Sequence, residues 1–129
     1  MNKILVEVSV GELLDKISIL EIKSEKIKDP EKLNFIKDEY KILKNRLNTS
    51  IKNYNDIESL YNSLKEINSK LWVIEDDKRL CEKNSNFGEK FIKLSRDVHF
   101  LNDERSKLKL EINNKTGSKI KEIKEYTKY

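Results

Sequence analysis

The chain has 129 residues, of which 39% are charged and 36% hydrophobic, a balance typical of exposed helices with narrow apolar stripes. It contains 3 Gly and 1 Pro, so few long loops are expected, and the length fits one domain. The net charge of +4 comes from interspersed basic and acidic residues, so it does not favour nucleic acid as a partner.

Cysteine content and hydropathy narrow the class of protein further. The single cysteine, Cys81, excludes an intramolecular disulfide and a cysteine-rich zinc site. There is no apolar run as long as a membrane span, and the first residues lack the apolar core of a signal peptide. We therefore expect a mainly all-α protein in the cytoplasm, built as one antiparallel helical bundle over residues 1–129.

The beginning of the chain combines a strand signal with a helix start. Residues 3–8 read Lys-Ile-Leu-Val-Glu-Val, and their β-branched content predicts a short strand. Such a strand needs a partner, either the C-terminal tail or the same strand of a second subunit. Ser9 followed three residues later by Glu12 is a capping box, so a helix is predicted over 10–27.

A second helix is predicted over 30–51, because Asp29 and Pro30 form an N-cap and a first helical position. The short connection makes the first two helices antiparallel. Both carry apolar residues outside their main stripes, and a bundle of this size has too few layers to cover them all. We therefore expect a homodimer that buries some of four residues, Ile19, Ile22, Phe35 and Ile42.

The remaining helices are predicted over 56–83 and 87–113, as a long helical hairpin. Apolar residues recur alternately three and four positions apart in both halves, which is the pattern of a coiled-coil seam. Lys78 and Arg105 interrupt this seam. The tail, residues 118–129, has no decisive pattern and is compatible with a frayed helix, an edge strand or disorder.

Polar residues gather on the hairpin and form the candidate site. One interpretation is a pocket of acids, one histidine and arginines beside an aromatic wall. The other is a set of surface ion pairs such as Glu75 with Arg79, which contribute little individually. The candidate residues are Glu75, Asp76, Arg79, Arg96, His99, Asn102, Asp103 and Arg105.

Arg105 is the most informative of these residues, because it occupies a seam position where Leu or Ile is expected. A buried guanidinium has to be paired or it is very costly. Arg105 therefore either binds a buried carboxylate of the first helix or faces a cavity that holds an anion. The candidate carboxylates are those of Glu12, Asp15 and Glu21.

Motifs for metal or nucleophilic chemistry are weak in this chain. His99 and Asp103 are spaced i, i+4, but no HExxH or ExxH set accompanies them, so no metal site is predicted. Cys81 has no histidine at helical spacing, and the three glycines are too scattered to form a phosphate loop. We therefore predict no cofactor.

Three stretches of the chain, Val8–Lys23, Leu71–Arg79 and Phe91–Arg105, resemble an uncharacterised family of small bacterial proteins known as a domain of unknown function. The resemblance covers nearly the whole chain and implies a bacterial helical protein, without implying an activity. The rhythm of Leu13–Leu20 also resembles the first helix of the helical chorismate mutases. Those enzymes need basic side chains around a dicarboxylate, and the first helix here has no arginine.

Two hypotheses about function follow. The first is a non-enzymatic protein-interaction or adaptor module that acts as a homodimer and binds another bacterial protein, since the early helices carry spare apolar surface. The alternative is an enzyme that uses the polar cluster of the hairpin to bind an anionic small molecule or a metal. A closed pocket at the cluster favours the enzyme, and solvated ion pairs favour the adaptor.

Overall fold

The computed structural model describes residues 2–129, so Met1, the first residue of the predicted domain, lies outside the described residues. Residues 2–129 form an all-α structure without strands, which confirms the all-α part of the predicted fold class. The elements are α1 (Val10–Lys26), α2 (Pro30–Ser50), the 3₁₀ turn η1 (Tyr54–Asp56), α3 (Glu58–Lys83) and α4 (Glu89–Thr116).

Local signals explain where these helices begin. The Ser9 hydroxyl accepts a hydrogen bond from the backbone N–H of Glu12 at 3.1 Å, as the capping box predicts. The Glu12 carboxylate, expected to reach back to Ser9, instead binds Lys109 of α4. At α2 the Asp29 carboxylate caps the backbone N–H of Glu31 at 3.0 Å, and Pro30 takes the first helical position.

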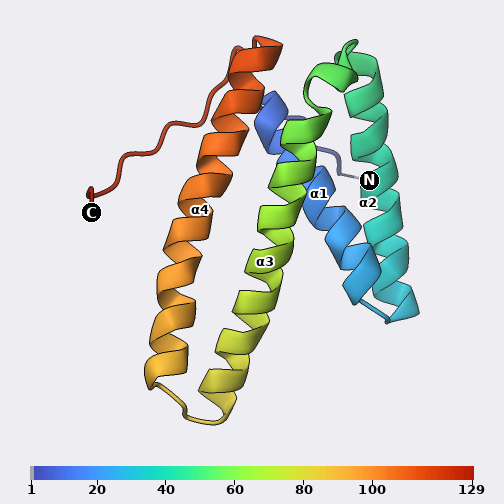
Figure 1. Ribbon diagram of the computed structural model, residues 1–129. Helices are drawn as coiled ribbons and strands as arrows, with labels where there is room; N and C mark the ends of the chain where they lie inside the picture. The colour runs from blue at the N-terminus through green and yellow to red at the C-terminus, as the bar shows by residue number, and fades with distance from the viewer. Residues whose placement is uncertain (1) are drawn as a thin grey trace.

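The predicted strand over residues 3–8 is wrong for the single chain. Residues 2–9 have no regular secondary structure, and neither does the end of the tail. A strand is stable only beside a partner strand. Figure 1 shows that this segment and the tail, its candidate partner within the chain, leave the bundle in different directions, the tail beside α4 and the first residues behind α3.

The helices are arranged as a hairpin with a second helical pair lying across it. α3 and α4 run antiparallel, α1 packs against both of them, and α2 packs against α1 (Figure 1). The far part of the hairpin extends beyond α1 and α2. The main core therefore lies at the other end, where all four helices contribute to it: Leu14, Ile17, Leu47, Ile57, Tyr61, Leu64 and Ile112.

α1 crosses the hairpin obliquely, from α4 toward α3. Near its start, the backbone N–H of Gly11 donates to the side chain of Asn113 on α4 at 2.7 Å. Further along, Ser18 accepts a hydrogen bond from Asn68 on α3 at 2.8 Å. The crossing is close, because a Cβ atom on Gly11 would lie 2.5 Å from the backbone oxygen of Lys109. A glycine is therefore required where the two helices touch.

We predict that Gly11→Ala destabilises the protein. The added methyl group meets the α4 backbone, which cannot rotate away, so we expect a loss of roughly 1–3 kcal/mol in the free energy of unfolding, typical of overpacking. Urea unfolding measures this loss. Gly88→Ala is the matched control, since its nearest neighbour would be an Asn86 side-chain atom at 3.6 Å. Equal stability of the two variants would show that the α1–α4 contact is looser than described.

Candidate functional site

The centre of the molecule holds a buried ion pair between α1 and α4. Arg105 donates from Nε to one oxygen of Asp15 at 2.9 Å and from a terminal nitrogen to the other oxygen at 2.6 Å. The Asp15 side chain is 3% exposed and that of Arg105 is 29% exposed. This two-bond geometry matches a planar guanidinium to a carboxylate. The predicted pairing of Arg105 with a first-helix carboxylate is thus confirmed.

Polar groups around this pair complete its hydrogen bonding. Asn68 of α3 donates to the same Asp15 at 2.9 Å, and the hydroxyl of Ser18 donates to the backbone oxygen of Asp15 at 2.8 Å. Lys109 of α4 lies 3.9 Å from Asp15 and 2.8 Å from both Glu12 and Glu122. We call the set Glu12, Asp15, Ser18, Asn68, Arg105 and Lys109 the α1 junction.

The junction changes the ionisation of its members. Burial alone would raise the pKa of Asp15, but the hydrogen bonds from Arg105 and Asn68 and the positive charges of Arg105 and Lys109 lower it below its ordinary value. The hydrogen bond with Asp15 outweighs burial and raises the pKa of Arg105. Burial opposes the charged form of Lys109, but its bonds to Glu12 and Glu122 raise the pKa of that amine. All three groups are therefore charged at neutral pH.

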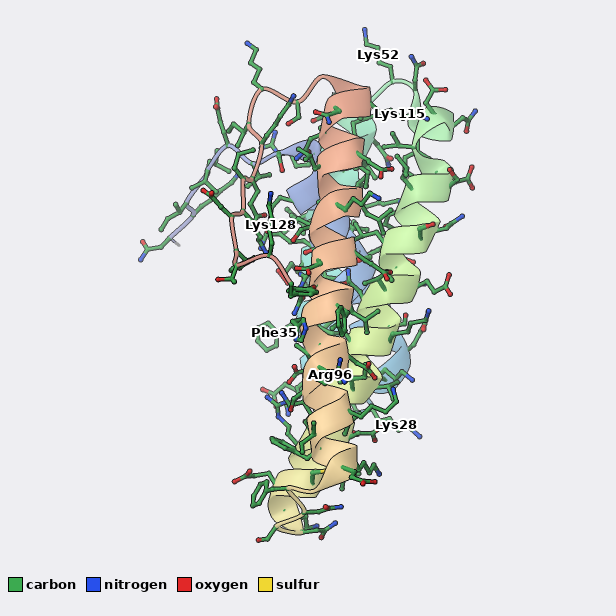
Figure 2. The ribbon with its side chains drawn as sticks, turned by 60° about the vertical axis from the view of Figure 1, so that its left-hand side comes forward. Lys28, Phe35, Lys52, Arg96, Lys115 and Lys128 are labelled. Atoms are coloured by element: carbon green, nitrogen blue, oxygen red, sulfur yellow. The ribbon has the colours of Figure 1, made fainter. Side chains whose placement is uncertain are left out.

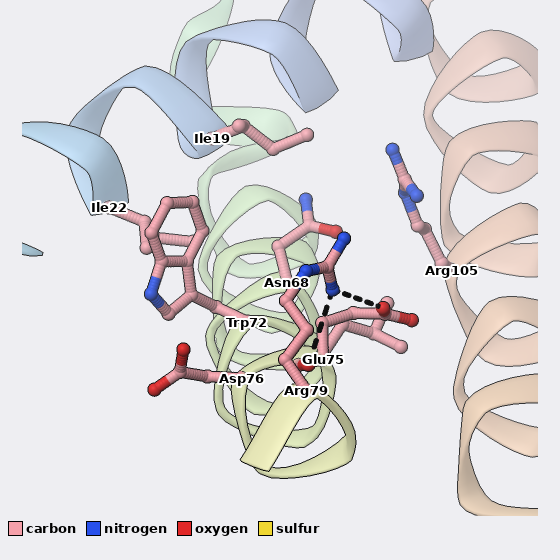
Figure 3. A pocket seen from close by; sticks show the side chains of 9 residues that line it. Ile19, Ile22, Asn68, Trp72, Glu75, Asp76, Arg79 and Arg105 are labelled. Atoms are coloured by element: carbon pink, nitrogen blue, oxygen red, sulfur yellow. Dashed lines mark hydrogen bonds and ion pairs between the residues drawn. The ribbon is translucent and has the colours of Figure 1, made fainter. Parts of the chain in front are cut away.

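A groove of about 420 Å³ lies next to the junction, on the side facing the far part of the hairpin. Most of its exposed surface is apolar, with Ile19 and Ile22 contributed by α1 and Trp72 by α3 (Figure 3). We call it the Trp72 groove. Its lining residues are Ile19, Ile22, Asn68, Leu71, Trp72, Glu75, Asp76, Arg79 and Arg105.

The charged residues of the Trp72 groove are largely engaged with one another. Arg79 donates to the Glu75 carboxylate at 3.1 Å, one helical turn away, and this pair is solvent-exposed (Figure 3). Arg105 is held by Asp15. Asp76 is exposed at the edge of the groove. The groove therefore offers an apolar surface with a polar rim.

Four of the predicted site residues thus come together in the Trp72 groove, namely Glu75, Asp76, Arg79 and Arg105. Three others lie on another side of α4. The guanidinium of Arg96, a residue labelled in Figure 2, lies 6.0 Å from the centre of the Phe100 ring. His99 lies against the rings of Phe100 and Tyr129, and Asp103 accepts a hydrogen bond from Tyr129. The eighth, Asn102, is half-buried on α4.

This division corrects the idea of one continuous polar cluster. The sequence placed His99 and Asp103 on one helical face, which is right, but the partner of that face is the C-terminal tail. The tail returns along α4, where Tyr129 covers His99 and Phe100. The predicted cluster consequently separates into a groove facing α1 and an edge facing the tail.

Sequence reasoning missed several residues of the junction. Asn68 and Ser18 are both buried, although neither stood out in the sequence. A usable signal was present, because Asp15 and Ser18 are three residues apart on an otherwise apolar face of a helix. Lys109 was not singled out because lysine is so common in this chain.

Residues 2–129 contain neither a metal-binding cluster nor a membrane-spanning helix. Across these residues, no group of three or more His, Cys, Asp or Glu side chains lies close enough together to hold a metal ion. In the same part of the chain, no helix combines the length and the hydropathy needed to cross a membrane.

A family model described as a family of unknown function (DUF6165) matches residues 4–129. The chain belongs to this family. The resemblance drawn from the three motif stretches is therefore confirmed, while the bacterial origin stays a prediction. Neither the curated proteins nor the solved structures gave a match.

In this DUF6165 chain, two of the three motif stretches meet at the α1 junction. Val8–Lys23 contributes Asp15 and Ser18, and Phe91–Arg105 contributes Arg105. The remaining stretch, Leu71–Arg79, supplies one wall of the Trp72 groove. The motifs that carry the resemblance thus supply the Asp15–Arg105 pair and one wall of the groove next to it.

We predict that acid weakens the protein through Asp15. A carboxylate whose pKa is lowered by folding stabilises the protein above its unfolded value, near 3.8, and loses this effect as the pH falls through the lower folded value. At pH 7, Asp15→Asn should therefore lower the unfolding free energy by roughly 3 kcal/mol, because Arg105 and Lys109 lose the negative charge that they face.

The difference in unfolding free energy between the parent and Asp15→Asn should shrink as the pH drops below about 4. Urea unfolding between pH 7 and pH 2.5 measures it. Asp38→Asn, which removes an exposed carboxylate of α2, is the control and should stay close to the parent at every pH. A difference for Asp15→Asn that stays constant over this range would contradict the role given to its charge.

Proposed function

We propose that this protein is a non-enzymatic protein-interaction module that acts as a homodimer and receives apolar side chains of a partner protein in the Trp72 groove. One observation carries the proposal. Ile19 of α1 and Trp72 of α3 stay half-exposed in the groove, while the arginines beside them are paired with carboxylates of the same chain.

The position of the groove supports this proposal. α1 is held at its start by the α1 junction and by the close contact at Gly11, so its later half passes over α3 at a fixed angle. Ile19 therefore stays half-exposed beside α3, while Ile22 next to it is buried (Figure 3). A rigid, preformed apolar groove with a polar rim is suited to binding, because little order has to be created when a partner enters.

The composition of the groove resembles that of a protein-binding surface. Tryptophan and arginine are the residues that most often dominate the energy of protein–protein contacts, and the groove has Trp72 and Arg79 close together. The exposed Glu75–Arg79 pair contributes little to folding, so it can rearrange around an incoming side chain.

The alternative, an enzyme acting on an anionic ligand, receives less support from the geometry. An anion at the groove would have to compete for Arg105 with a carboxylate that already makes two hydrogen bonds to it. Arg79 is bound to Glu75, and Asp76 would repel the ligand. The charges around the groove thus favour an apolar partner over a small anion.

Exposed apolar residues support the homodimer. Of the four spare apolar residues, Ile22 is buried within the subunit and Ile19 is half-buried, whereas Phe35 and Ile42 on α2 are exposed. The subunit therefore still has uncovered apolar surface of the kind that marks contact sites. The bacterial origin and the cytoplasmic location remain predictions from the sequence.

We predict that Trp72→Ala weakens partner binding at least tenfold, because truncation of a central aromatic residue typically costs about 2 kcal/mol or more. The immobilised protein is used to capture its partner from a native extract, and the affinity of the purified partner is then measured. Trp72 is the only tryptophan, so its fluorescence should shift to shorter wavelength when the partner covers the groove.

Leu80→Ala is the control for this experiment. Leu80 lies on the same helix, is exposed, and does not line the groove, so its truncation should leave affinity unchanged. The proposal fails if Trp72→Ala binds the partner as tightly as the parent, or if the fluorescence of Trp72 does not respond to binding.

A further inference from the structure

The apolar segment at the start of the chain has no partner in the subunit. Within residues 3–8, Ile4, Leu5 and Val6 are exposed. The exposed fractions of Leu5 and Val6 are similar, 69% and 73%. Within residues 2–129, no backbone–backbone hydrogen bond reaches this segment. Figure 2 shows it leaving the helices. A β-branched segment with free backbone groups is a template for pairing with another strand.

We propose that residues 3–7 pair with the same residues of a second copy, antiparallel, with Leu5 on the two-fold axis. The inference rests on the proposed homodimer and specifies which residues form part of its contact. Charge complementarity identifies the second copy as the partner. In this register Lys3 of each copy lies opposite Glu7 of the other, and Ile4 lies opposite Val6.

Other registers are worse for physical reasons. A parallel, in-register pair would set Lys3 beside Lys3 and Glu7 beside Glu7, which is repulsive. A shift of one residue places either Glu7 opposite Ile4 or Lys3 opposite Val6. A shift of two residues places Leu5 opposite one of the two charged residues. Among these registers, only the proposed one places both Lys3 and Glu7 opposite a residue of opposite charge.

The proposed pairing also explains why the strand signal in the sequence is not realised in one subunit. The alternation places Ile4, Val6 and Val8 on one face, while Lys3, Leu5 and Glu7 form the other. A two-stranded ribbon is only marginally stable in water, so we expect a dimer with a dissociation constant in the micromolar range, in which the ribbon adds to contacts of the helices.

Disulfide cross-linking tests the register. Leu5→Cys should form a disulfide-linked dimer, because the two introduced cysteines face each other across the axis. Val6→Cys is the matched control, equally exposed and adjacent in sequence. Its two copies would lie diagonally, about 7–8 Å apart, which is too far for a disulfide. We expect at least tenfold faster cross-linking of Leu5→Cys under mild oxidation. The parent, whose only cysteine is buried, is the blank.

Charge reversal tests the partner. Lys3→Glu should raise the dimer dissociation constant about tenfold in sedimentation equilibrium, since two attractive pairs become repulsive. The double variant Lys3→Glu, Glu7→Lys should restore it to within about threefold. Restoration together with selective cross-linking supports the proposal.

The opposite results distinguish two failures. A parent that is monomeric at about 100 µM overturns both the homodimer and the strand pairing. A dimeric parent whose dissociation constant ignores Lys3→Glu, with equal cross-linking at positions 5 and 6, overturns the strand pairing alone and leaves a dimer formed by the helices.

Discussion

A buried carboxylate on α1, Asp15, has to be paired, and the rest of the structure depends on how that requirement is met. Arg105 supplies the pair from α4, Asn68 supplies a further donor from α3, and Lys109 adds a second positive charge. Breaking such a pair leaves an uncompensated charge in the interior, which is costly. Because its partners come from both helices of the hairpin, Asp15 fixes α1 across the hairpin at one position and one angle.

The oblique crossing of α1 determines where the molecule is closed and where it is open. On one side of the junction, all four helices share an apolar core. On the other side α1 has moved away from α4, so Ile19 stays half-exposed and the Trp72 groove remains (Figure 3). The same ion pair that secures the fold therefore neutralises Arg105, which lines the neighbouring groove, while Ile19 and Trp72 stay half-exposed there. The Asp15–Arg105 pair therefore underlies both the fold and the proposed function.

Local patterns predicted much of this fold from the sequence, because helix caps and apolar spacing act over a few residues. The capping signals at Ser9 and Asp29 and the hairpin of α3 and α4 are examples. Arg105 was predicted to bind a first-helix carboxylate because a buried charge in an apolar seam has to be paired with an opposite charge. The strand over 3–8 and the single polar cluster were not realised. Both depended on which distant segment lies alongside, and spacing within one helix cannot specify that.

A double-mutant cycle on Asp15 and Arg105 tests the central claim most directly. Asp15→Asn, Arg105→Met and the combination are unfolded with urea at pH 7, and the three losses of unfolding free energy are compared. Each single change should cost roughly 3 kcal/mol, because each strands a charged partner. The combination should cost about 2 kcal/mol less than the sum of the two, since neither charge is then left without the other. Losses that add to within about 0.5 kcal/mol would show that Asp15 and Arg105 do not act as a pair, and would contradict the account.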